Sequence, residues 1–230
     1  MRTIGLIGGM SWESSIEYER IIHEEVRDRL GTTHSAKTLH WTFDFHEIEA
    51  LQEAGDWDAA ASEMVRAAAA LRGAGADLLL ICTNTMHLVF DAVQEAVDVP
   101  VLHIADATAA AIGEAGLGSV GLLGTAYTME HPFYRGRLED RHGLGVLIPG
   151  AAERADVHRI IYDELVRGEV RSDSRERYLE VIGGLVSAGA EGIIAGCTEV
   201  ELLVHTDDLE VPYFPTARLH ALAAVDAALA

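Results

Sequence analysis

Short apolar segments alternate along this chain with longer segments in which apolar residues recur at helical spacing. Five segments show the pattern most clearly: residues 3–9 (TIGLIGG), 37–45 (KTLHWTFDF) and 76–85 (ADLLLICTNT) as strands, and residues 15–30 and 57–75 as amphipathic helices. The first helix should begin at a serine cap, Ser14 or Ser15, and end at Gly31. The alternation predicts an α/β fold with parallel sheets and helices on both faces.

The same landmarks occur twice, in the same order and at nearly constant spacing. Residues 4–9 (IGLIGG) match 120–125 (VGLLGT), residues 76–84 match 190–199, and residues 99–112 match 211–224. Three ordered matches indicate duplication. We therefore predict two similar α/β lobes related by a pseudo-twofold axis. Residues 1–100 with 212–230 form the first lobe, and residues 101–211 form the second.

Composition narrows the classes of partner. Of the 230 residues, 49% are hydrophobic, and the net charge is −20. This acidity argues against nucleic acid and anionic membranes as partners. No apolar run reaches the roughly 18 residues of a membrane span, and the N-terminus does not resemble a signal peptide. We expect a cytoplasmic protein.

The chain has two cysteines, Cys82 and Cys197, and each ends an apolar strand. Ligands of open parallel sheets bind beyond the carboxyl ends of the strands. A helix N-terminus there should lower a thiol pKa. Two thiols facing each other across a cleft between the lobes would supply the base and the acid that invert a stereocentre. The alternative is that each cysteine is a small buried apolar residue, but matching positions in the repeat favour the functional interpretation.

Other candidate groups are weaker signals. The turns at residues 8–11 and 124–125 are neither GxGxxG nor a P-loop, so they predict a carboxylate site or only a tight turn. Candidate donors for a developing negative charge are Ser11, Thr83, Asn84, Thr85, Thr125 and Thr198, although each could simply cap a helix.

The histidines are interpreted as surface or core residues without a catalytic role. Lys37 is the single lysine and lies at a predicted strand start, so we expect no lysine-linked pyridoxal phosphate and no other cofactor or metal.

Several longer motifs resemble one known family. They are residues 8–14 (GGMSWES), 82–87 (CTNTMH), 102–108 (LHIADAT), 122–125 (LLGT) with 127–130 (YTME), and 196–199 (GCTE). Together they resemble the aspartate/glutamate racemase family, and within it the branch of L-aspartate/glutamate-specific racemases. The resemblance implies two Rossmann-like lobes, an active site in the cleft between them, catalysis by Cys82 and Cys197, no cofactor, and a homodimer.

The resemblance also suggests which residues bind substrate. The predicted substrate-binding residues are Met10, Ser11, Gln52, Thr83, Asn84, Thr85, Thr125, Thr198 and Glu199. Two positions depart from relatives of the family. Pro215 stands where many have an acidic residue, and Val166 or Arg167 stands where some aspartate racemases have a lysine.

The leading hypothesis is a cofactor-independent racemase of aspartate or glutamate that uses two thiols. A second hypothesis keeps the fold and changes the reaction to that of a maleate isomerase, a hydantoin racemase or an arylmalonate decarboxylase. A third is a non-catalytic amino-acid-binding protein.

Overall fold

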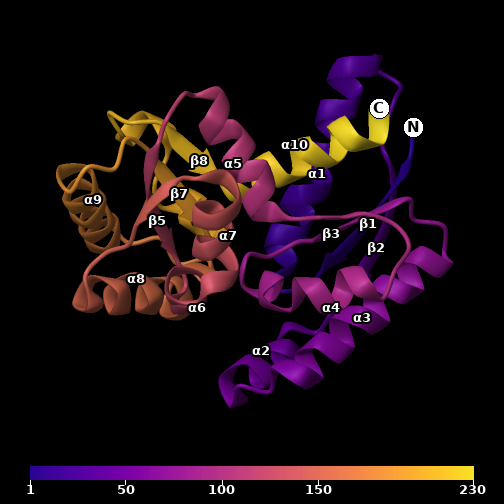
Figure 1. The fold of residues 1–230 in the computed structure, drawn as a ribbon, viewed down its shortest axis with the longest axis horizontal. Coiled ribbons are helices and arrows are strands. Elements are labelled where there is room, and N and C mark those ends of the chain that lie inside the picture. Colours follow the sequence, from indigo (N-terminus) through magenta and orange to yellow (C-terminus); the bar gives the residue numbers. More distant parts are fainter. The chain divides into compact units, whose positions relative to one another are not determined.

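The computed structural model describes residues 1–197 and 200–230. Two four-stranded sheets run through the chain, with strand orders β2-β1-β3-β4 and β6-β5-β7-β8. Every strand pair is parallel. Helices separate the strands along the sequence (Figure 1). The predicted α/β fold and the predicted duplication of its sheet are confirmed.

The first compact unit comprises Met1–Ile104 and His220–Ala230. Its elements are β1 (Thr3–Gly8), α1 (Trp12–Leu30), β2 (Lys37–Thr42), α2 (Phe45–Ala54), α3 (Trp57–Gly73), β3 (Leu78–Ile81), the 3₁₀ helix η1 (Thr85–Val89), α4 (Phe90–Glu95) and β4 (Val101–Leu102).

The second compact unit comprises Ala105–Leu219. Its elements are β5 (Ser119–Gly124), α6 (Ala126–Glu130), α7 (Pro132–His142), β6 (Gly145–Leu147), α8 (Ala151–Asp163), η2 (Leu165–Arg167), α9 (Ser172–Ser187), β7 (Ile193–Gly196), η3 (Thr198–Leu202), η4 (Thr206–Asp208) and β8 (Tyr213–Pro215). Two helices carry the chain between the units, α5 (Ile104–Glu114) and α10 (Thr216–Leu229).

The sequence predicts unit boundaries near residues 100 and 212. In the structure, both boundaries lie a few residues later, after Ile104 and after Leu219. The chain first completes each sheet with a short edge strand and only then passes to the other unit. β4 pairs with β3 in the first sheet, and β8 pairs with β7 in the second. The crossings therefore lie at the start of α5 and within α10.

The first helix begins earlier than its apolar pattern indicates. Ser11 is its cap, and the Ser11 side chain accepts a hydrogen bond from the Ser14 backbone N–H at 3.3 Å. A serine side chain at this position satisfies one of the N–H groups that a helix start leaves unpaired. The predicted caps Ser14 and Ser15 instead lie inside α1, which ends at Gly31 as predicted.

Helices cover both faces of the first sheet. Met64, Ala67 and Leu71 of α3 pack with Leu79 and Ile81 of β3 in one apolar cluster. In Figure 1, α3 and α4 lie along one side of this sheet, and α1 and α10 lie along the other.

α1 and α10 are joined by a buried contact. The Tyr18 hydroxyl lies 2.9 Å from His220 Nδ1, and His220 Nε2 lies 2.9 Å from the Leu102 carbonyl oxygen. The hydroxyl therefore donates to Nδ1, and Nε2–H donates to the carbonyl. The C-terminal helix is thereby fixed to the first unit.

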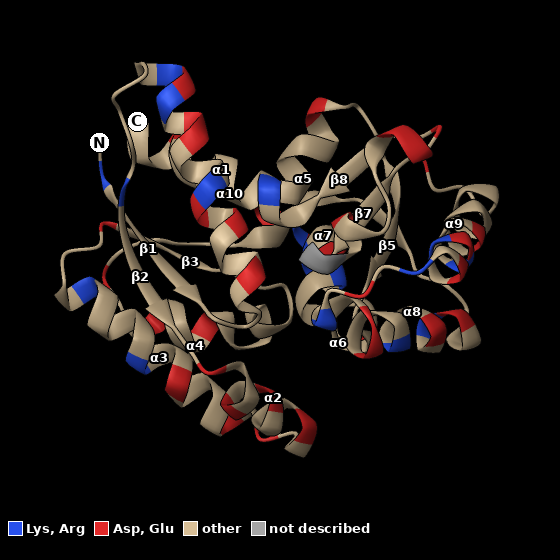
Figure 2. Ribbon diagram, turned by 180° about the vertical axis from the view of Figure 1, so that it is seen from behind, with Lys and Arg blue, Asp and Glu red and all other residues tan. Residues whose placement is uncertain are grey.

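Charged residues are absent from the centres of both sheets. The four central strands β1, β3, β5 and β7 contain no charged residue. Figure 2 shows acidic side chains along the helices, interspersed with arginines. None of the described helices is long and apolar enough to cross a membrane.

Candidate active site

In the first unit, Cys82 lies where two neighbouring strands end. β1 and β3 are adjacent, with Ile7 opposite Ile81. The Cys82 backbone N–H donates to the Ile7 carbonyl at 2.9 Å and extends this pairing by one residue. The Cys82 side chain is completely buried. Parallel pairing thus places the thiol at the carboxyl edge of the sheet, beside the turn that follows β1.

That turn needs glycine at its centre. Gly9 has φ of +83°, and a Cβ atom there would lie 2.4 Å from the backbone of Phe43. The Gly9 N–H donates to the Ser15 hydroxyl at 2.8 Å. Met10 and Ser11 follow, both buried, and Ser11 caps α1. The capping alternative therefore holds for Ser11, and this role also fixes its position beside the Cys82 edge.

The other predicted residues of this unit gather around η1. Asn84 and Thr85 are buried directly after Cys82 and Thr83. Gln52 of α2 is also buried, and its amide nitrogen donates to the sulfur of Met86 at 3.2 Å. The structure therefore brings Gln52, which is distant in the sequence, to the loop that carries the first thiol.

His87 supports this loop, a role that the sequence did not reveal. Its Nε2 lies 3.2 Å from the Ile104 backbone N–H, which can only donate, so Nε2 accepts. Nδ1 then carries the proton and donates to the Thr83 carbonyl at 2.8 Å. The neutral ring holds the residue next to Cys82. A histidine five positions after a cysteine is no signal of this in the sequence alone.

The prediction of a lowered thiol pKa is wrong for Cys82. Burial raises the pKa of the Cys82 thiol far above its usual range, and the hydrogen bond with the Ile7 backbone offsets this only in part. A thiolate loses its hydration when it is buried, and here that loss dominates. The helix that follows is only the short 3₁₀ helix η1.

In the second unit, Cys197 and Thr125 follow neighbouring strands in the same way. Gly124 of β5 lies opposite Gly196 of β7. Cys197 is buried, with 9% of its surface exposed. Thr125 caps α6, and its hydroxyl accepts from the Thr128 N–H at 3.4 Å. The side chains of Thr198 and Glu199, both predicted to bind substrate, lie outside the described residues.

His158 of α8 supports the turn after β5. Its Nδ1 accepts from the Ala126 backbone N–H at 3.2 Å, beside Thr125. Burial lowers the pKa of His158 and outweighs the opposing effect of Glu130 and Asp163. A neutral ring is the form that can accept this hydrogen bond. As with His87, this supporting role could not be predicted from the sequence alone.

The sequence matches had indicated that the two cysteines occupy equivalent positions of the repeat. The pairing of the strands shows that they do not. Gly5 pairs with Leu79 in the first sheet, and the matching Gly121 pairs with Ile193 in the second. Counting along the strands from these pairs, Cys82 corresponds to Gly196, and Cys197 corresponds to Thr83.

This shift of one residue places the thiols on opposite faces of their sheets, because side chains alternate along a strand. Cys197 is extended, and it packs in the apolar cluster that includes Ala195 and residues of α8 and α9. Cys82 follows Leu80 in the alternation. In the first unit, the corresponding cluster contains Leu79 and Ile81 instead.

The two departures from the family pattern lie in the second unit. Pro215 ends β8. Val166 and Arg167 lie in η2, directly after the buried Glu164. Burial alone would raise the pKa of Glu164, but hydrogen bonds from Ser174 and Arg159 hold it below its usual value. The segment of Val166 and Arg167 is thus preceded by a buried, ionised carboxylate.

Comparison with known proteins shows which family the chain belongs to. A model of the Asp/Glu/hydantoin racemase family matches residues 7–224. The chain belongs to this family. The family resemblance inferred from the sequence motifs is therefore confirmed.

Solved structures of the family are similar over the whole chain. A proposed Asp/Glu racemase from Yersinia pestis is 51% identical over 100% of both chains, with a TM-score of 0.95. An aspartate racemase homologue from Pyrococcus horikoshii is 35% identical over 100% of both chains, with a TM-score of 0.87. The aspartate racemase of Picrophilus torridus, at 21% identity, shares the fold with a TM-score of 0.77 over 99% of this chain and 94% of its own.

Proposed function

We propose that this protein is a cofactor-independent racemase of acidic amino acids that uses Cys82 and Cys197 as its acid/base pair. The observation that carries the proposal is the placement of the cysteines. Each directly follows an inner strand, β3 or β7, and each lies beside the turn of the adjacent strand. Family membership supports racemisation, and the names of the relatives favour aspartate or glutamate as substrate.

The proposed reaction transfers two protons at the α-carbon. One cysteine, as a thiolate, takes the α-proton, so that an S–H bond forms as the C–H bond breaks. The electron pair stays on the substrate as a carbanion delocalised into its carboxylate. The other cysteine, as a thiol, then gives its proton to the opposite face of the α-carbon. The product has the opposite hand, and the two sulfurs have exchanged protonation states.

The unequal environments of the cysteines suggest which state begins the cycle. Because burial raises the pKa of Cys82, this thiol is protonated in the unliganded protein. Cys82 then serves first as the proton donor, and Cys197 serves as the base. The substrate hand whose α-proton faces Cys197 would react directly with this state.

The carbanion needs donors that are already in place. Backbone N–H groups and side chains after β3 and β5 are suitably located, among them Asn84, Thr85 and Thr125. Lys37 is exposed at the start of β2, at the end of the strand away from this edge. A pyridoxal phosphate Schiff base at Lys37 would therefore lie at the opposite end of the first sheet from Cys82.

Exchange of the α-proton in deuterated water tests the proposal. We expect the wild type to incorporate deuterium into aspartate or glutamate and to interconvert the two hands, followed by mass spectrometry and chiral chromatography. Cys82→Ser and Cys197→Ser should each lower racemisation by about 10³-fold, because each removes one acid/base group. Glu176→Gln, on an exposed position of α9, is the matched control and should leave the rate unchanged.

Other outcomes would redirect the assignment. Binding of an amino acid without exchange would indicate a binding protein. Turnover of maleate, hydantoins or arylmalonates, without exchange of any amino acid, would indicate another reaction of the family's fold. Full activity in both serine variants would refute the two-thiol mechanism.

A further inference from the structure

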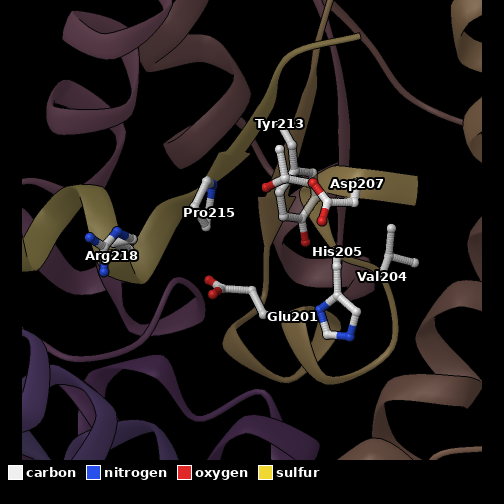
Figure 3. Close-up of a pocket in the computed structure, with 8 residues that line it drawn as sticks. Glu201, Val204, His205, Asp207, Tyr213, Pro215 and Arg218 are labelled. Atoms are coloured by element: carbon white, nitrogen blue, oxygen red, sulfur yellow. The ribbon is translucent and has the colours of Figure 1, made fainter. Parts of the chain in front are cut away.

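The second unit has a cavity of about 320 Å³ at the carboxyl edge of its sheet. Figure 3 shows the side chains that line it, which come from η3, η4, β8 and the start of α10. Pro215 of this lining lies opposite Ala195, two residues before Cys197. The cavity therefore belongs to the site proposed for the cysteines. In the first unit, the surroundings of Cys82 depend instead on a buried histidine.

His87 joins two segments of the first unit. Its Nδ1–H donates to the Thr83 carbonyl at 2.8 Å, and its Nε2 accepts from the Ile104 backbone N–H at 3.2 Å. Ile104 begins α5, so this contact also satisfies one of the N–H groups that a helix start leaves unpaired. One ring thus connects the loop after Cys82 to the start of α5.

Packing leaves the His87 ring little freedom to move. Only 2% of its surface is exposed. The ring stacks on Phe90 with ring planes 10° apart, and its centroid lies 4.6 Å from that of the His103 ring. A side chain enclosed in this way stays in one rotamer, so its Nδ1–H is aimed at one fixed place.

The residue after the first thiol is held at both ends. The Thr83 N–H donates to the Ile81 carbonyl at 2.9 Å, and the Thr83 carbonyl accepts from His87. Cys82 lies between these residues, and its own N–H donates to the Ile7 carbonyl. The backbone on either side of Cys82 is therefore fixed, and with it the direction of the bond that carries the sulfur. Of these contacts, the one from His87 is made by a side chain, so substitution can remove it.

We propose that His87 is a positioning residue for Cys82: through the Thr83 carbonyl, it holds the thiol in the place where it exchanges a proton with the α-carbon. The inference rests on the function proposed for Cys82. His87 acts through the backbone and transfers no proton itself. Because orientation of the reacting groups supplies much of the rate, a small displacement of the sulfur should slow the chemical step and leave substrate binding intact.

Two substitutions separate the two hydrogen bonds of His87. The amide of asparagine lies near the position of Nδ1, so His87→Asn can still donate to Thr83 but loses the contact with Ile104. The amide of glutamine lies near the position of Nε2, so His87→Gln can still accept from Ile104 but loses the contact with Thr83. Each variant loses one hydrogen bond of a buried ring, so a general loss of stability would affect both alike.

Alkylation of Cys82 tests the positioning without any turnover. The full-length variants are treated with iodoacetamide, and mass spectrometry follows labelling of the peptide that contains Cys82. A completely buried thiol reacts only when its loop opens. We expect His87→Gln to raise the labelling rate about tenfold, the effect of losing one hydrogen bond, and His87→Asn to raise it less than about threefold.

Racemisation provides the second readout. The kcat of His87→Gln should fall at least about tenfold with KM within about twofold of wild type, and His87→Asn should keep at least about a third of the wild-type kcat. His23→Gln is the matched control, because His23 Nδ1 also accepts from a backbone N–H, that of Ala36, at the opposite end of the first sheet. This control should leave both readouts unchanged.

The inference is overturned if Cys82 is labelled equally fast in wild type and His87→Gln, if His87→Asn and His87→Gln lose kcat equally, or if the loss appears in KM alone. Faster labelling in His87→Gln, without racemisation by the wild type, would support the positioning of the thiol by His87 and refute the proposed function. The two failures are therefore distinguishable.

Discussion

The two units have the same strand order but place their thiols differently. In each, a central strand ends in a glycine turn, and the neighbouring strand ends at the proposed site. In the first unit, the thiol follows Ile81 directly. In the second, Gly196 occupies that position, and the thiol comes one residue later. The duplication preserved the sheet without preserving the position of the thiol.

This difference shows that the two thiols are not interchangeable. Cys82 is completely buried, with a raised pKa, and Cys197 is slightly exposed within the cluster that α8 and α9 cover. A racemase needs its two groups to begin a cycle in different protonation states. The displaced register gives each thiol its own environment, and this asymmetry is suited to that need.

The strongest test of this asymmetry exchanges Cys82 and Thr83. The double variant Cys82→Thr with Thr83→Cys moves the first thiol to the position that corresponds to Cys197. Because neighbouring residues point to opposite faces, we expect racemisation to fall about 10³-fold, as far as in Cys82→Ser. Chiral chromatography measures the rate. Recovery of near wild-type activity would show that the register of the thiol is unimportant.

A second test adds a side chain where the second unit has none. A Cβ atom on Gly196 would lie 2.8 Å from the Leu123 carbonyl oxygen, a backbone atom that cannot easily move. We expect Gly196→Ala to lower the free energy of unfolding by about 2 kcal/mol, measured by urea denaturation.

The control for this test is Gly183→Ala. Gly183 lies on α9 with open space around it. Alanine favours a helix interior more than glycine does, so this variant should be about 0.5–1 kcal/mol more stable than wild type. Equal stability of the two variants would mean that the close approach of β5 and β7 does not restrict position 196.

The last test measures the pH dependence of stability that Cys82 confers. Its folded-state pKa is raised above that of an unfolded thiol. Above about pH 8.5, the unfolded chain loses this proton and the folded chain keeps it, so stability falls as pH rises. Relative to Cys82→Ser, the wild type should lose about 1.4 kcal/mol of unfolding free energy per pH unit in this range. Urea denaturation from pH 7 to pH 10, with Cys197→Ser in parallel, measures it. A constant difference between wild type and Cys82→Ser would contradict the raised pKa.

Much of the fold could be predicted because it depends on local patterns. The alternation of apolar strands and amphipathic helices gave the element order, and the repeated segments indicated a second sheet like the first. The helix start at Ser11 was missed because capping depends on one side-chain hydrogen bond, which periodicity does not reveal. The family resemblance suggested that Gln52 binds substrate, but neither it nor any local pattern indicated the contact of Gln52 with Met86.

The sequence by itself determined the α/β class, the duplication and the family, since these follow from periodicity and from motifs read in order. Three features were decided only by the tertiary structure. They are the one-residue difference between the positions of Cys82 and Cys197 relative to their strands, the support that His87 gives to Thr83, and the raised pKa of Cys82. Each of these depends on which backbone lies opposite which, and on how completely a group is removed from water. Those quantities arise only when residues far apart in the chain pack together.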